Sequence, residues 1–448
     1  MQKNSGSFWR TLISIAVPVT LQNLLFSSFT LVDTLMVGRL GDTSLAAVGM
    51  AGKWTWFFTI VLFGFTSGAA VFIAQYFGAN DRAGIHRTYG VMTIGTLAAS
   101  LVFMLLAMIV PQQIIGLLSS DPAALETAST YLRIIALAYP FQALRRSAGT
   151  LLQSTQRVVI PFVGAVCSVV TNIVLNAVLI FGLFGFPALG VTGAAIASVI
   201  AAAVDMAVVF IGGYAKKTML RAPLSAMLDI NRDFIRQYVR IGAPAMFNET
   251  LWALGNLIYS AIYGHMGTEA YAAITVVRSI EDLTCVAIFG LGSSCAVMIG
   301  SYIGQKKIDT AKRCAWYHLK LTVILSGVIG AAVVMFRQPI MSLFGVSDVV
   351  RSNASMVLLI YGLDMIMRNL PYMMVVGIFR AGGDSRYGLI VDAVTAYLIG
   401  IPLTATAGLV LGLSVPATYL IMYLVEDVLK VFIYGRYMLS YKWIKPVV

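Results

Sequence analysis

The chain has 448 residues, of which 59% are hydrophobic and only 11% are charged, and its mean hydropathy is +0.86. Soluble domains average about 45–50% apolar and about 25% charged residues, so the composition excludes a soluble globular protein and indicates an integral membrane protein. The four cysteines show no pairing pattern, and the three histidines lie far apart without an HExxH, GxSxG or Walker sequence. We therefore expect no disulfide framework, no metal site, no cofactor and no enzymatic activity.

Long apolar stretches follow one another along the whole chain. A helix needs about 20 apolar residues to cross about 30 Å of hydrocarbon, and these stretches lack the alternation of a transmembrane barrel. The first stretch is longer than the apolar core of a signal peptide, so we expect it to stay as the first helix. The sequence thus predicts an all-α integral membrane protein with twelve spans, over residues 11–38, 45–77, 88–110, 124–152, 158–182, 189–213, 234–264, 270–303, 316–336, 350–378, 387–411 and 415–438.

Basic residues gather in alternate loops between these spans. The loops 111–123, 183–188 and 412–414 contain no Lys or Arg. Positive residues mark cytoplasmic loops, so we expect both termini in the cytoplasm and a multi-pass protein of the cytoplasmic (inner) membrane. This rule accounts for the net charge of +12 without nucleic acid as a partner. The basic residues on the expected cytoplasmic side are Lys3, Arg10, Arg82, Arg87, Arg157, Lys216, Lys217, Arg221, Arg232, Arg236, Lys306, Lys307, Lys312, Arg313, Arg386, Lys442 and Lys445.

The chain contains an internal repeat. Residues 10–78 align without gaps on 236–304, with 17 identities in 69 positions that include Pro18 with Pro244. Six spans per repeat give both halves the same orientation, so they form two six-helix lobes related by pseudo-two-fold symmetry about the membrane normal. We expect an N-lobe over 1–213, a cytoplasmic linker over 214–233 and a C-lobe over 234–448. A proline inside a helix removes one backbone hydrogen bond and permits a kink. Its place at the same point of both repeats points to a hinge at Pro18, and a merely tolerated proline is the alternative.

The stretch TLVDTLMVGRLG places one carboxylate, Asp33, near the end of the first span. A charge in hydrocarbon costs at least about 2.5–3.5 kcal/mol. A protonatable switch and a structural carboxylate bonded to neighbouring helices both explain it. We favour the switch because the depth and isolation of Asp33 give it no obvious cationic partner nearby in the sequence.

Several motifs together resemble one transporter family. VDTLMVGRLG followed by LAAVG, AQYFGA after the second span, its counterpart IGSYIGQ, and GIFRAGGDSR after the tenth span resemble the multidrug and toxic compound extrusion (MATE) transporters. The resemblance covers essentially the whole chain. It implies two bundles around a V-shaped central cavity, and export of organic cations by antiport against protons or sodium.

The resemblance also implies which residues couple transport to a cation. Asp33, fifteen residues after Pro18, stands where the family's coupling carboxylate stands. Asn172 matches an asparagine of the fifth helix, Asn176 stands where the family often has an aspartate, and Ser198 stands for a hydroxyl of the sixth helix. One carboxylate among neutral oxygens binds sodium less strongly than two do, yet protonates readily once desolvated. We therefore expect H⁺ as the coupling ion, with Na⁺ as the alternative.

The C-lobe offers a candidate second polar site. It consists of Glu249, Glu281, Asp364 and Asn369, although neither Glu249 nor Asp364 falls on the family's usual register. Spacing favours local ion pairs of Arg278 with Glu281 and of Asp364 with Arg368.

Polar, aromatic and soft side chains suit a cavity for small-molecule substrates. The candidates are Gln22, Asn23, Phe26, Tyr139, Trp252 and Met365. The alternative function is a lipid-linked saccharide flippase of the same superfamily, which would use intramembrane arginines such as Arg145, Arg146 and Arg368. We expect a monomer whose other partner is the lipid bilayer.

Overall fold

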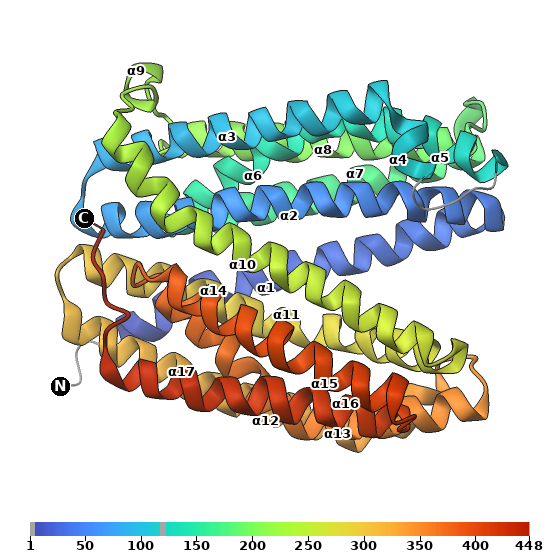
Figure 1. Cartoon of the computed structure of the whole chain (residues 1–448). Helices are drawn as coiled ribbons and strands as arrows, with labels where there is room; N and C mark the ends of the chain where they lie inside the picture. The colour runs from blue at the N-terminus through green and yellow to red at the C-terminus, as the bar shows by residue number, and fades with distance from the viewer. Residues whose placement is uncertain (1–4, 117–121, 448) are drawn as a thin grey trace. The chain divides into compact units, whose positions relative to one another are not determined.

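The structure is a computed structural model that describes residues 5–116 and 122–447, and the side chains of these except 5–7, 29–31, 42 and 122–124 (Figure 1). Lys3, one of the basic residues used above, lies outside the described residues. Throughout the described part the regular elements are helices. Helical bonding within each segment is the way a spanning chain satisfies its backbone polar groups in lipid.

The first half of the chain forms long helices joined by short connections. Its helices are α1 (Ser5–Gly38), α2 (Asp42–Ala79), α3 (Arg82–Ile109), α4 (Pro111–Gly116), α5 (Pro122–Ile135), α6 (Tyr139–Ser154), α7 (Val159–Phe181), α8 (Gly190–Ala215) and the short α9 (Leu224–Met227). A single 3₁₀ turn, Ala136–Ala138, joins α5 to α6, so the predicted fourth span is interrupted rather than continuous.

The second half repeats this order with more irregular late helices. Its helices are α10 (Arg232–His265), α11 (Thr268–Gly304), α12 (Ile308–Ser342), α13 (Asp348–Tyr372), α14 (Ser385–Ala393), α15 (Ile401–Ala405), α16 (Val415–Tyr423) and α17 (Leu429–Ser440). The π-helical segments Met373–Phe379, Val394–Gly400, Thr406–Val410 and Leu424–Val428 interrupt or extend them. Such widened turns occur often at functional sites, because they re-aim side chains.

Each of the twelve predicted spans falls on described helix. Nine helices of the described residues are long and apolar enough to cross a membrane by length and composition alone. The other three spans correspond to α5 with α6, to α10 and to α16 with α17, which are interrupted or carry more charge. The partners of several of these charges, among them Arg145, Glu249 and Lys430, are described below.

The chain divides into two compact units. One is Val17–Val239, and the other combines Met1–Ala16 with Arg240–Val448. One division falls inside α1 immediately before Pro18, and the other inside α10 shortly before Pro244. The lobe boundaries expected from the sequence stay a prediction.

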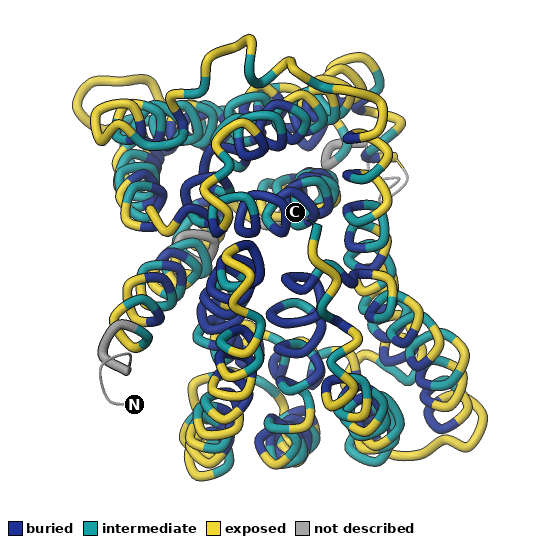
Figure 2. Tube along the Cα trace, turned by 90° about the vertical axis from the view of Figure 1, so that its left-hand side faces the viewer, coloured by how far each residue is buried: buried dark blue, intermediate teal, exposed yellow. Residues whose placement is uncertain are grey.

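Each unit has its own apolar core. The core of unit 17–239 gathers Val37, Phe58, Leu132 and Tyr139 with other side chains from α1 to α8. That of unit 240–448 gathers Tyr263, Val277, Leu358 and Tyr361 with others from α10 to α16. In Figure 2 the buried positions of a helix face its neighbours in the same unit, while exposed positions line the opposite side. This one-sided burial is expected where lipid covers the outer face.

The C-terminal segment packs into a glycine-lined recess beside the connection between α13 and α14. The Lys445 backbone N–H donates to the Gly382 carbonyl oxygen at 2.7 Å, and Trp443 is fully buried. Gly383 has φ +98°, and a Cβ atom there would lie 2.1 Å from the Lys445 carbonyl oxygen. The C-terminal segment passes so close to Gly382 and Gly383 that a larger side chain would collide with its backbone, which explains the two glycines of the RAGGDS sequence.

We expect Gly383→Ala to lower the free energy of unfolding by about 1–3 kcal/mol, because alanine disfavours this backbone conformation and its methyl group meets the Lys445 carbonyl. Thermal unfolding of the detergent-solubilised protein measures the effect. Gly345→Ala is the matched control, since its Cβ would meet nothing within 4 Å. Equal stability of the two variants would contradict the packing described here.

Candidate coupling site and polar networks

Asp33 of α1 lies against two asparagines of α7. The Asn176 side-chain Nδ2 donates to Asp33 Oδ1 at 2.7 Å and to Asn172 Oδ1 at 2.7 Å. Asn172 in turn donates through Nδ2 to the Ser198 hydroxyl on α8 at 3.1 Å. The four residues expected to couple transport to a cation therefore form one continuous hydrogen-bonded chain across three helices.

Helix geometry explains why these side chains meet. Asn172 and Asn176 are four residues apart, so they share one face of α7. That face packs along α8, and the Leu189 N–H just before α8 donates to the Leu179 carbonyl near the end of α7 at 2.8 Å. Both asparagines are almost completely buried, where an unpaired amide would be costly.

The electrostatic environment of Asp33 is unusual. Within the described part of the chain its carboxylate forms no ion pair, and its hydrogen-bond partner is a neutral amide. The Asn176 Oδ1 atom is buried and has no hydrogen-bond partner among the described residues. The site thus presents a carboxylate and an uncommitted amide oxygen, which are acceptors for a proton or a small cation.

Tyr131 is a member of this site that the sequence analysis missed. Its hydroxyl group lies close to Ser198, and the residue belongs to the apolar core of the unit near Asp33. Tyr131 is one of 20 tyrosines, and no local pattern in the sequence sets it apart.

In the second unit Glu281 and Arg368 form a bidentate ion pair, with nitrogen–oxygen distances of 3.1 and 3.0 Å. The Tyr419 hydroxyl also donates to Glu281, at 2.5 Å, and Arg368 contacts the Tyr423 hydroxyl. The expected local pair of Arg278 with Glu281 is therefore wrong. Arg278 instead donates to the Ser260 hydroxyl at 2.5 Å, because partners on facing helices outcompete a neighbour one turn away.

The expected pair of Asp364 with Arg368 is wrong as well, since Arg368 is committed to Glu281. The Asp364 Oδ2 atom is instead buried without a hydrogen-bond partner among the described residues. Asn369, the fourth member of the candidate second site, donates its side-chain N–H to the Ser326 hydroxyl at 3.0 Å. This bond connects Asn369 to a hydroxyl group rather than to a carboxylate of the candidate site.

Glu249 has a partner that its sequence neighbourhood did not reveal. Arg380 Nη1 lies 2.6 Å from Glu249 Oε1, and the same guanidinium contacts Asn248. Asn248 donates to Asp392 at 2.8 Å, and Asp392 lies 3.3 Å from the Lys430 ammonium. The candidate second site is therefore split between separate ion pairs rather than gathered in one cage.

The internal repeat could have pointed to part of this network. Asn248 is the repeat counterpart of Gln22, and Gln22 accepts a hydrogen bond from Gln153 of α6 at 3.4 Å. Asn248 is contacted in the same way by Arg380. Each repeat thus joins its first helix to the end of its fourth span by a polar pair.

The candidate substrate-cavity residues fall into different environments. Tyr139 and Met365 are fully buried, and Tyr139 stacks on Phe58 at 4.4 Å and bonds to the Thr55 hydroxyl at 3.0 Å. Gln22 is buried, Asn23 and Phe26 are half-buried, and Trp252 is 63% exposed. A role in binding substrate stays a prediction for all six.

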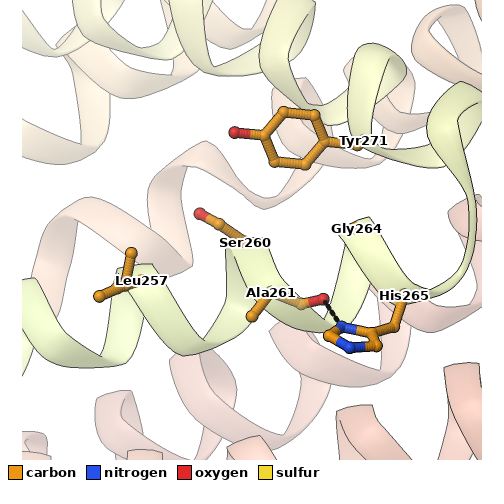
Figure 3. Close-up of a pocket in the computed structure, with 6 residues that line it drawn as sticks. All are labelled: Leu257, Ser260, Ala261, Gly264, His265 and Tyr271. Carbon is orange, nitrogen blue, oxygen red and sulfur yellow. Dashed lines mark hydrogen bonds between the residues drawn. The ribbon is translucent and has the colours of Figure 1, made fainter. Parts of the chain in front are cut away.

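A shallow hollow of about 360 Å³ lies beside the end of α10 (Figure 3). Leu257, Ser260, Ala261, Gly264, His265 and Tyr271 line it. The His265 ring hydrogen-bonds through Nδ1 to the Ala261 carbonyl at 2.8 Å, as the dashed line in Figure 3 shows. None of the predicted site residues lines this hollow.

Comparison with known proteins identifies the family. The MatE family model matches residues 18–178 and again 244–406, once in each repeat. The chain belongs to the MATE family. It is 29% identical to the probable multidrug resistance protein YoeA of Bacillus subtilis over 77% of this chain and 75% of that protein. It is 27% identical to the multidrug resistance protein MdtK of Edwardsiella ictaluri over 88% and 87% of the two chains.

Solved MATE structures confirm the fold. A mutant of the Vibrio cholerae MATE transporter VcmN superposes with a TM-score of 0.89 at 20% identity, over 99% of this chain and 100% of that one. A MATE structure in a bent conformation superposes with a TM-score of 0.87 at 16% identity, over 97% and 95%. The protein therefore has the MATE fold of twelve transmembrane helices in two lobes. Its family consists of multi-pass membrane transporters, and its relatives carry the names of multidrug efflux proteins.

The flippase alternative is not favoured. Arg145 is paired with Asp205 at 2.9 Å and Arg368 with Glu281 at 3.0 Å, so neither presents an uncompensated charge to a pyrophosphate. The guanidinium of Arg146 lies over the Phe63 ring. The paired arginines and the relatives, which are named multidrug resistance proteins, both favour efflux over a flippase activity.

We expect Arg380→Gln to lower the free energy of unfolding by about 3–5 kcal/mol, because it leaves the Glu249 carboxylate without its cationic partner. Arg351→Gln is the matched control. Its ion pair with Asp348 is exposed, with 98% of the Asp348 side chain accessible, and such pairs contribute about 0–1 kcal/mol. Unfolding in detergent should separate the two variants, and a negligible loss for Arg380→Gln would show that the Glu249 pair contributes little.

Proposed function

We propose that this protein exports organic, cationic and amphipathic compounds by antiport with protons, and that Asp33 is the coupling residue. The supporting observation is the bond of Asp33 to a neutral amide instead of a cation. A carboxylate held in this way can take up and release a proton without first breaking an ion pair. In this proposal the protein works as a monomer in the cytoplasmic membrane, with both of its termini in the cytoplasm.

The coupling step follows from the hydrogen bonds. A carboxylate accepts the Asn176 N–H bond strongly because it is charged, and a protonated carboxyl group accepts it less strongly. Protonation therefore weakens the tie between α1 and α7. Pro18 lies inside α1 and removes one backbone hydrogen bond there, so α1 bends near this residue. The bend lowers the affinity of the cavity for substrate, and rocking of the two lobes then returns the cavity to the other side of the membrane.

The proposal is tested in proteoliposomes with a fluorescent organic cation, ethidium, under imposed gradients. We expect a pH gradient alone to drive uphill transport. Transport driven only by a sodium gradient would replace proton with sodium coupling, and transport driven by neither would overturn the antiport proposal.

Asp33→Asn should reduce uphill transport to the level of empty liposomes, because the amide cannot take up a proton. The variant should still insert and fold, since an amide can hydrogen-bond to Asn176. Asp348→Asn serves as the matched control, because this exposed carboxylate starts α13 away from the network. Full activity of Asp33→Asn would remove Asp33 from the mechanism.

Asn176→Asp should strengthen sodium dependence. It places a second carboxylate beside Asp33, with Asn172 and Ser198 oxygens nearby, and hard oxygen ligands with more negative charge favour a metal cation. We expect sodium to stimulate the variant at least about tenfold more than the parent, which corresponds to about 1.4 kcal/mol. Titration of ethidium transport with NaCl at constant ionic strength measures this, and an unchanged sodium response would refute it.

A further inference from the structure

A second buried polar layer lies two helical turns from the coupling site. Arg145 of α6 and Asp205 of α8 form an ion pair, with Nε and Oδ2 2.9 Å apart and side chains only 11% and 9% exposed. Asp205 follows Ser198 by seven residues on α8, and Phe26 precedes Asp33 by seven on α1. Seven residues span about 10 Å along a helix, so both layers cross the same helices.

Helix α7 makes room for the buried carboxylate. A Cβ atom at Gly164 would lie 2.6 Å from Asp205 Oδ1. Any side chain at this position would collide with the carboxylate and displace it. Gly164 lies eight residues before Asn172 on α7. The ion pair of Arg145 with Asp205 therefore lies beside the first turns of α7, and the coupling site lies beside its later turns.

Arg145 also reaches α1. Its guanidinium carbon lies 5.5 Å from the centroid of the Phe26 ring, within the range of a cation–π contact. Asp205 therefore holds a cation that in turn supports the part of α1 between Pro18 and Asp33. A bend of α1 at Pro18 displaces Phe26 and disrupts this contact.

The ion pair is only partly satisfied. Asp205 Oδ1 and Arg145 Nη2 are buried without a hydrogen-bond partner among the described residues. A buried pair with unsatisfied atoms contributes little net stability. Such a pair can hold α1 in place and still release it at modest cost.

We propose that Asp205 is a positioning residue for antiport, which holds Arg145 against Phe26 and thereby favours the form of α1 in which Asp33 is bonded to Asn176. This inference rests on the proposed function. The contact of Arg145 with Phe26 is then a second interaction that holds α1, besides the hydrogen bond of Asp33 to Asn176. Its strength determines how readily protonation of Asp33 lets α1 bend. Among the described residues, Arg145 is the charged group that forms an ion pair with Asp205, and Tyr131 is a titratable group close enough to Asp33 to interact with it electrostatically.

The test is pH-driven ethidium exchange by Asp205→Asn in proteoliposomes. Weakening the held form of α1 by a factor of about three to ten should raise the half-saturating ethidium concentration by the same factor and move the pH midpoint of exchange upward by about 0.5–1 unit. The maximal rate should stay within about twofold, because saturating substrate restores the held form. A merely structural role would lower the amount of active protein without moving either midpoint.

A double-variant comparison tests the route through Phe26. Phe26→Leu alone should shift both midpoints in the same direction, and the combination with Asp205→Asn should add nothing to the larger single effect. Phe63→Leu is the matched control, since it removes the contact of the neighbouring Arg146 with α2, 5.2 Å from the ring centroid, and should leave both midpoints unchanged. Effects of Phe26→Leu and Asp205→Asn that multiply would overturn the inference.

Asp205→Asn leaves the Arg145 charge buried, so a neutral pair provides a second variant. Arg145→Gln with Asp205→Asn should show the same raised half-saturation as Phe26→Leu. Parental midpoints in this double variant would overturn the positioning role of Asp205. If Asp33→Asn is inactive in the same assay, the proposed function still stands. Absence of exchange in the parent protein would overturn both proposals.

Discussion

The hydrogen bond from Asn176 to Asp33 is the interaction on which the site depends. A carboxylate among apolar helices needs compensation, and here an amide dipole supplies it in place of a cation. The amide is itself fixed by Asn172, and Asn172 is bonded to Ser198, so three helices share the stabilisation of one carboxylate. An amide compensates a charge only in part. The arrangement therefore leaves the carboxylate sensitive to any cation that reaches it.

The two repeats share a backbone plan but differ in their polar chemistry. The position of Asp33 corresponds to Tyr259 in the second repeat, where the hydroxyl donates to Glu426 at 2.7 Å. Around it, Glu281 is closed by Arg368 and Glu249 by Arg380, while Lys430 lies 2.7 Å from Glu426. Most acidic side chains there are neutralised by the protein itself. The two halves of a symmetric architecture thus differ in the polar groups that they leave uncompensated, and the proposed function assigns cation binding to the first half.

Apolar run length predicted the twelve spans because lipid imposes one requirement, internal backbone bonding, on every segment. The resemblance to the family pointed to Asp33, Asn172, Asn176 and Ser198 as candidate coupling residues, and the structure joins these four by hydrogen bonds, while their role in coupling stays a prediction. Ion pairs in the second unit could not, because Glu281 and Arg368 lie 87 residues apart and a local spacing rule favoured Arg278 instead. Interhelical partners depend on register and rotation, which a single sequence does not encode locally. Tyr131 has no distinguishing context for the same reason.

The contacts of α1 form a graded series along its length. Asp33 is tied to α7 by a charge-assisted hydrogen bond, Phe26 to α6 by the Arg145 guanidinium, and Gln22 to α6 by a long amide contact of 3.4 Å. The strength of these ties falls from Asp33 toward Pro18, where the helix lacks a backbone bond. A change of charge at Asp33 therefore acts on the strongest tie and leaves weaker ones to yield in turn. In the proposed mechanism, a helix held most firmly at its titratable end, and least firmly beside its proline, converts a local protonation into a bend.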